Sequence, residues 1–157
     1  MRLSNPLSDP KKQHKHYSGK KKRHTQKAQI MVDLKSKQII ATAFCAGRQH
    51  DFQLFKESQA TPATTTCLLA DSGYQGLTNV HANCQTPTKK TKLHPLTATQ
   101  KALNRALSHQ RILIENVLAR LKVFRILSER YRNRRKRFGL RFNLIAAIYN
   151  LELKSTA

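Results

Sequence analysis

The sequence predicts an α/β fold in which helices flank a mixed β-sheet. Two runs of strand-forming residues, 28–32 and 38–44, are separated by the polar segment 33–37, which predicts a hairpin. A short apolar run at 67–70 then ends at Asp71-Ser72-Gly73, as a buried strand does when it stops at a turn. Strands early in the chain and long helical patterns late in it favour one sheet with helices packed against it.

The helical pattern is strongest between about 97 and 127, where Thr97 is the predicted N-cap. Apolar side chains recur there at the spacing of one helix face, at Leu103, Leu107, Ile114, Val117, Leu118, Leu121 and Phe124. A second amphipathic helix is predicted at 138–153. A short helix begins near Asp51, its predicted N-cap, and a short strand is expected within 83–87.

The charge of the chain points to a polyanionic partner. Thirty Lys and Arg stand against eight Asp and Glu, for a formal net charge of +22. Such an excess opposes compaction unless a polyanion is near, which favours nucleic acid as the partner. A membrane is disfavoured because no secretory signal is evident and the apolar stretch 138–153 is interrupted by Arg141, Asn143, Asn150 and Glu152. We therefore expect a cytoplasmic, DNA-associated protein with no membrane partner.

Composition divides the chain into a basic N-terminal arm, 1–27, and one domain, 28–157. The arm is polar, punctuated by proline and densely basic, which predicts a flexible segment leading into a strand. Three cysteines, Cys45, Cys67 and Cys84, are odd in number and lack C-x-x-C spacing. This spacing predicts free thiols rather than a disulfide framework or a zinc site.

Two acids stand out in a chain that has only eight. Asp71 follows the predicted buried strand, at the edge where open sheets gather ligands, and Glu115 borders the apolar face of the long helix. If the helix packs on the sheet, the two carboxylates could converge on a divalent cation. Oxygen ligands suit Mg²⁺ or Mn²⁺, and two such ions about 3.5–4 Å apart clamp the reacting oxygens of a phosphodiester.

Simpler interpretations remain open on the pattern alone. Asp71 before Ser-Gly is also a common turn-former, and Glu115 can pair with Arg111 one helical turn away. His14-Lys15-His16-Tyr17 suggests a histidine pair beside a nucleophilic tyrosine, and hence a different endonuclease. The intervening lysine and the mobile character of the arm argue against that interpretation.

Five motifs occur in a fixed order along the chain. They are His16-Tyr17-Ser18-Gly19-Lys20-Lys21-Lys22-Arg23-His24-Thr25, Gly47-x-x-His50-Asp51, Asp71-x-Gly73-Tyr74-x-Gly76, Pro87-x-Lys89-Lys90 and Arg111-x-x-x-Glu115. Together they resemble DDE-type transposases of the insertion-sequence-five group, and the segment 130–145 resembles the C-terminal tail of that group. The match covers about 6–153.

The resemblance implies a ribonuclease-H-like fold in which three carboxylates hold two divalent metals, Mg²⁺ or Mn²⁺. It implies that Asp71 is the second carboxylate, on a core strand, and that Glu115 is the third, on the helix packed beside it. The first Asp of the family aligns with about Met1 and is absent, as are its strand and the N-terminal helical DNA-binding domain. Asp9 is too close to the basic motif to replace it, and Asp33 lies on or beside a strand but in a register that does not match. The chain therefore resembles a truncated catalytic domain that lacks the first strand, from a gene remnant or a split reading frame.

The predicted function is metal-dependent DNA strand cleavage and strand transfer in transposition, impaired by the missing carboxylate. The alternative is a non-enzymatic basic nucleic-acid-binding protein, or a fragment that regulates an intact transposase. Expected partners are DNA, as element ends and target, and a second copy or an intact transposase. Basic loops contact phosphates without base selectivity. The predicted DNA-binding residues are Lys20, Lys21, Lys22, Arg23, Lys89, Lys90, Arg111, Lys122, Arg132, Arg134, Arg135, Lys136 and Arg137.

Overall fold

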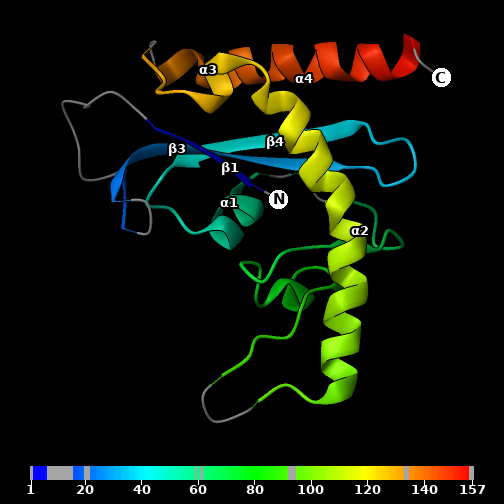
Figure 1. Cartoon of the computed structure of the whole chain (residues 1–157). Helices are drawn as coiled ribbons and strands as arrows, with labels where there is room; N and C mark the ends of the chain where they lie inside the picture. Colours follow the sequence, from blue (N-terminus) through cyan, green and yellow to red (C-terminus); the bar gives the residue numbers. More distant parts are fainter. Residues whose placement is uncertain are drawn as a thin grey trace.

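The computed structural model describes residues 2–6, 16–19, 22–58, 60, 62–91, 95–132 and 135–155. Its centre is an antiparallel sheet built around one long strand, β3 (Arg23–Val32). The strands β1 (Arg2–Pro6), β2 (Tyr17–Ser18) and β4 (Ile39–Ala46) all pair with β3. Figure 1 shows helices above and below this sheet, so the chain has the mixed α/β architecture that the sequence predicts.

The predicted hairpin is present and is formed by β3 and β4. Ile30 pairs with Thr42, and Val32 pairs with Ile39 after a register irregularity at the end of β3. Asp33 holds the connecting turn, because its carboxylate accepts from the Ser36 amide at 2.9 Å and from the Ser36 hydroxyl at 2.6 Å. These contacts lower the pKa of Asp33, with the side-chain hydrogen bond from Ser36 as the largest cause.

The structure contains a strand, β1, ahead of the basic segment. Arg2 pairs with Gln29 and Pro6 with Thr25. The sequence predicts a sheet without an opening strand there, and this expectation is wrong. The sequence pattern missed β1 because this strand is held by backbone hydrogen bonds to β3, which is distant in sequence. Backbone hydrogen bonds of this kind do not depend on the local amino-acid composition.

Two short strands form a separate parallel pair, β5 (Leu68–Leu69) with β6 (Cys84–Gln85). Strands are therefore present near 67–70 and 83–87, as predicted. The prediction that the first of them is a buried strand of one central sheet is wrong, because β5 is half-buried and pairs with β6 in a sheet separate from that of β3. Between them lies a 3-10 turn, η2 (Leu77–Asn79).

The first helix, α1 (Asp51–Glu57), is capped by His50 rather than by the predicted Asp51. The His50 ring accepts from the Phe52 amide at 3.4 Å, and Asp51 lies inside the first turn. The prediction is wrong because the Asp51 carboxylate is used elsewhere, in a buried ion pair described below.

The long helix α2 (Ala98–Lys122) begins with a capping box at Thr97 and Gln100, which confirms the predicted N-cap. It ends five residues earlier than predicted, and a separate short helix, α3 (Arg125–Ser128), follows. The break occurs because Phe124 takes an extended conformation and turns the chain, so that Leu127 becomes buried. After η3 (Arg135–Arg137), α4 (Phe138–Ser155) completes the chain.

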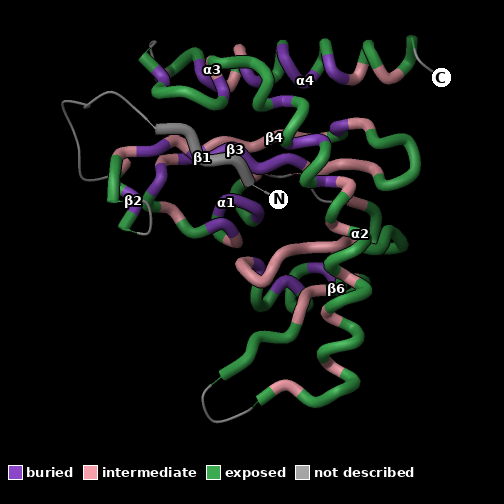
Figure 2. The backbone as a smooth tube through the Cα atoms, in the orientation of Figure 1, coloured by how far each residue is buried: buried purple, intermediate pink, exposed green. Residues whose placement is uncertain are grey.

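Alternate residues of β3 face two apolar clusters on opposite sides of the sheet, as expected for a strand. Ala28 and Ile30 belong to the larger cluster with residues of α2 and α4, whereas Met31 packs against the smaller cluster of Phe55, Tyr74 and Leu77. Figure 2 shows the buried residues concentrated where the helices meet the sheet. No helix in the described part of the chain is both long and apolar enough to cross a membrane.

Candidate functional site

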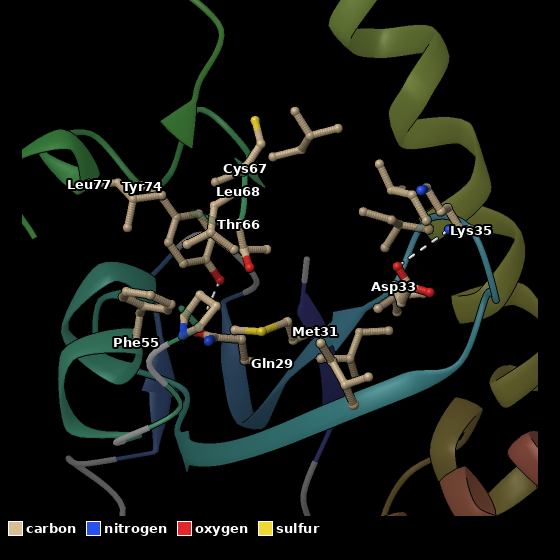
Figure 3. Close-up of a pocket in the computed structure, with 18 residues that line it drawn as sticks. Gln29, Met31, Asp33, Lys35, Phe55, Thr66, Cys67, Leu68, Tyr74 and Leu77 are labelled. Atoms are coloured by element: carbon tan, nitrogen blue, oxygen red, sulfur yellow. Dashed lines mark hydrogen bonds between the residues drawn. The ribbon is translucent and has the colours of Figure 1, made fainter. Parts of the chain in front are cut away.

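The turn after β5 presents Asp71 at the edge of the smaller apolar cluster. The Asp71 carboxylate accepts from the Ser72 amide at 2.6 Å, and the Asp71 carbonyl accepts from the Tyr74 amide at 2.9 Å. Tyr74 is buried, and its hydroxyl donates to Gln29 on β3 at 3.1 Å (Figure 3). The turn that carries Asp71 is therefore tied to the main sheet.

The structure brings Asp71 and Glu115 together on one guanidinium. Arg111 Nη1 lies 3.5 Å from Asp71 Oδ1, and Arg111 Nη2 lies 3.9 Å from Glu115 Oε1. Arg111 and Glu115 are one turn apart on α2 and form the helical ion pair that their spacing suggests. The contact of Arg111 with Asp71 is present in addition. Both carboxylates keep substantial solvent exposure.

The donor chemistry of this cluster suits a hard divalent cation, because both acids offer carboxylate oxygens. The positive charge beside both of them is the Arg111 guanidinium, however. In the part of the chain that the structure describes, no group of three or more His, Cys, Asp or Glu is arranged to hold a metal. The described residues thus bring two carboxylates together without a third acidic or histidine partner.

A buried ion pair lies next to this turn. Lys27 Nζ is 3.3 Å from Asp51 Oδ1 and donates to the Gln49 carbonyl at 2.5 Å, and both charged side chains are almost fully buried. A Cβ placed on Gly73 would lie 3.3 Å from Asp51 Oδ2, so the pair touches the backbone just beyond Asp71. The sequence signal for this pair is Lys27, which is in phase with Gln29 and Met31 on the face of β3 toward α1.

Comparison with known proteins identifies the family. A family profile described as the transposase DDE domain matches residues 3–151. The chain belongs to this family. It is also similar to a protein of Microchaete diplosiphon named "Probable transposase for insertion sequence element IS702", with 50% identity over 149 residues. That alignment covers 94% of this chain and 54% of the relative, so the chain spans about half the length of the curated relative that it matches. No solved structure matches the chain.

Transposases bind DNA, and members of the DDE family generally use divalent metal ions. Most basic residues that the sequence predicts to contact DNA in this DDE domain are exposed. The exposed members are Lys22, Arg23, Lys89, Lys90, Lys122, Arg132, Lys136 and Arg137. Arg111 differs from them because it is paired with two carboxylates. Lys20, Lys21, Arg134 and the side chain of Arg135 lie outside the described residues.

The histidine–tyrosine motif and the cysteines are the remaining candidates that the sequence suggests. Tyr17 is exposed on β2 and its ring packs edge-on against His24, with centroids 5.6 Å apart. His14 lies outside the described residues. All three cysteines are free, as their spacing predicts.

Proposed function

We propose that this chain is part of a transposase catalytic domain that performs metal-dependent DNA strand cleavage and strand transfer. Asp71 and Glu115 would be two of its metal-binding carboxylates, with Mg²⁺ or Mn²⁺ as the metal. The observation that carries the proposal is the convergence of Asp71, after β5, and Glu115, on α2, at a single cationic group. Carboxylates from a strand end and a packed helix can hold a metal against a scissile phosphate, and the metal would polarise that phosphate.

We propose that the fold is ribonuclease-H-like and that β1 belongs to its first strand. Among the described residues, β1 begins at Arg2 opposite Gln29, whereas β3 runs on to Val32 and pairs there with β4. Beside the last residues of β3 lies an apolar cavity of about 270 Å³ between β3 and β5 (Figure 3). Residues joined ahead of Arg2 would continue β1 along β3, beside this cavity and next to the Asp71 turn. That continuation is the proposed position of the third carboxylate.

It follows that the chain by itself should be impaired as an enzyme. Two carboxylates leave a divalent ion with too few fixed protein ligands, so the ion is not held where catalysis needs it. We propose a cytoplasmic, DNA-associated role in bacteria, with element ends and target DNA as partners.

Nicking of supercoiled plasmid in Mg²⁺ or Mn²⁺ tests this function. The chain alone should nick little. A version extended with the sequence of the Microchaete diplosiphon relative that lies outside the aligned region should nick, and Asp71→Ala or Glu115→Ala should abolish the gained activity. Glu129→Ala is the matched control, because Glu129 is an exposed acid that pairs only with Arg125 among the ion pairs of the described residues. Strong nicking by the unextended chain would show that another residue completes the metal site.

The second candidate function is a non-enzymatic nucleic-acid-binding or regulatory fragment. The net charge of +22 and the neutralisation of both acids by Arg111 favour it. An extended chain that binds DNA tightly but never nicks it would support this alternative. Inhibition of an intact related transposase by the unextended chain would identify the fragment as regulatory.

A further inference from the structure

The segment that follows β6 is held by the two elements that carry the candidate acids. Gln75, in the turn that begins at Asp71, donates from its side-chain amide to the Pro87 carbonyl at 3.5 Å. From the other side, the Asn104 side chain on α2 accepts from the Thr88 amide and donates to the Thr88 carbonyl, both at 3.0 Å. In Figure 2 the chain beyond β6 runs beside the first half of α2, which agrees with these contacts.

The two hydrogen bonds of Asn104 fix the backbone of one residue completely. An asparagine side chain offers an acceptor and a donor in one plane, so Asn104 pairs with both polar groups of Thr88, as a neighbouring strand does. Lys89 and Lys90 follow directly and are exposed. Both lysine side chains therefore start from a backbone that is held in place.

Asn104 lies on the same face of α2 as the candidate acid. Seven residues separate it from Arg111 and eleven separate it from Glu115. At about 100° per residue, all three lie within about 20° of one line along the helix, and Glu115 is about 16 Å further along the axis. A DNA strand that passes Glu115 and follows this face reaches the lysines about five nucleotides away, at about 3.4 Å per nucleotide.

The charge of this part of the chain suits a phosphate backbone. The sequence between Asp71 and Glu115 contains no other acid, so nothing on the segment or on this half of α2 repels a phosphate. Exposed lysines bind phosphate oxygens without reading the bases.

We propose that residues 87–90 form a phosphate clamp for the DNA strand that flanks the cleavage site, and that Asn104 is the residue that positions it. The clamp binds phosphodiesters about five nucleotides from the phosphate on which Asp71 and Glu115 would act. Asn104 acts through the lysines, because a segment that is already ordered loses less entropy when DNA binds. The inference rests on the proposed function for the identity of the strand, whereas phosphate binding by the clamp requires neither metal nor cleavage.

Amide hydrogen exchange of the full chain tests whether Asn104 holds the segment in solution. We expect the Thr88 amide to exchange several-fold faster in Asn104→Ala than in the wild type, with an unchanged urea midpoint. Asn116→Ala is the matched control, since Asn116 is an exposed asparagine of the same helix about 120° away from Asn104 around its axis. Equal exchange of Thr88 in the wild type and in Asn104→Ala would overturn the positioning role.

A double-mutant cycle on DNA affinity tests the clamp. With a labelled duplex and no divalent metal, Lys89→Ala with Lys90→Ala should make the slope of log K against log salt shallower by about two. Asn104→Ala should weaken binding about fivefold with nearly the same slope, because the lysines still reach a phosphate but are no longer ordered beforehand. In the double-lysine background, Asn104→Ala should have no further effect, and Asn116→Ala should bind as the wild type does.

The outcomes separate this inference from the proposed catalytic function. An unchanged slope for the double-lysine variant would overturn the clamp. An equal loss from Asn104→Ala in both backgrounds, or no loss in the wild type, would overturn the role of Asn104. None of these results depends on nicking, so an extended chain that fails to nick would overturn the catalytic function and leave the clamp established.

Discussion

Arg111 Nη1 lies 3.5 Å from Asp71 Oδ1, which joins the middle of α2 to the turn that follows β5. The same guanidinium reaches Glu115, so one cation neutralises both candidate metal ligands. Arg111 is less exposed than either acid, which places it between them rather than in open solvent. The charge of Arg111 therefore affects how strongly Asp71 and Glu115 can bind a cation.

Arg111→Ala should strengthen the binding of Mn²⁺ to the chain by about tenfold. Removing one positive charge from between two carboxylates favours a divalent cation there, and a tenfold change corresponds to about 1.4 kcal/mol. Titration of Mn²⁺ followed by electron paramagnetic resonance measures the affinity. Arg125→Ala is the matched control, since Arg125 pairs with Glu129 at 3.6 Å across one helical turn in the same way. Equal Mn²⁺ affinities for both variants would count against Asp71 and Glu115 as a joint metal site.

Asp51→Asn should destabilise the fold by about 3–5 kcal/mol, because it leaves Lys27 buried without its opposite charge. The free energy of unfolding in urea measures this loss. The double variant Lys27→Met, Asp51→Leu should recover much of it, since no charge then remains buried. Glu129→Gln, at an exposed acid that pairs with Arg125, is the control and should change stability by less than about 0.5 kcal/mol. A loss below about 1 kcal/mol for Asp51→Asn would mean that the pair is solvated in solution.

The hairpin turn should show a pH dependence that originates at Asp33. Hydrogen bonds from Ser36 lower the pKa of Asp33 below its ordinary value of 3.8 in the folded chain. A depressed folded pKa means that the carboxylate stabilises the turn above pH 3.8, and that this contribution is lost as the pH falls through the lower, folded value. Amide exchange at 34–38 should therefore be faster in Asp33→Ala than in the wild type at pH 6. If the difference persists unchanged at pH 2, the carboxylate is not its cause.

DNA binding should be strongly dependent on salt and nearly independent of sequence. Contact with about six phosphates gives a slope of log K against log salt near −5, and a slope shallower than about −1 would reject the electrostatic origin of binding. Lys136→Ala with Arg137→Ala should make the slope shallower by about two, since each lost phosphate contact removes about one. Lys56→Ala on α1, where the ammonium lies over the Phe52 ring, is the control and should leave the slope unchanged. Fluorescence anisotropy with a labelled duplex measures both slopes.

Elements with local causes were determined by the sequence alone. The start of α2 needs only Thr97 and Gln100, which satisfy each other's backbone amides three residues apart. The β3–β4 hairpin needs only its two strand-forming runs and the turn at Asp33. The helical periodicity of α4 likewise predicted its position. The candidate acids Asp71 and Glu115 came from strand-end and helix-face positions together with the family resemblance.

Only the tertiary structure decided the features whose partners are distant in sequence. The strand β1 exists because its backbone pairs with β3. Asp51 does not cap α1 because its carboxylate forms an ion pair with Lys27 of β3. Arg111 could be placed beside Glu115 from helical spacing, but its contact with Asp71 required the packing of α2 against the β5 turn. The physical reason is the separation along the sequence of the residues that interact. Caps, turns and periodicity are settled within a few residues, whereas strand pairing and buried ion pairs depend on which segments the folded core brings together.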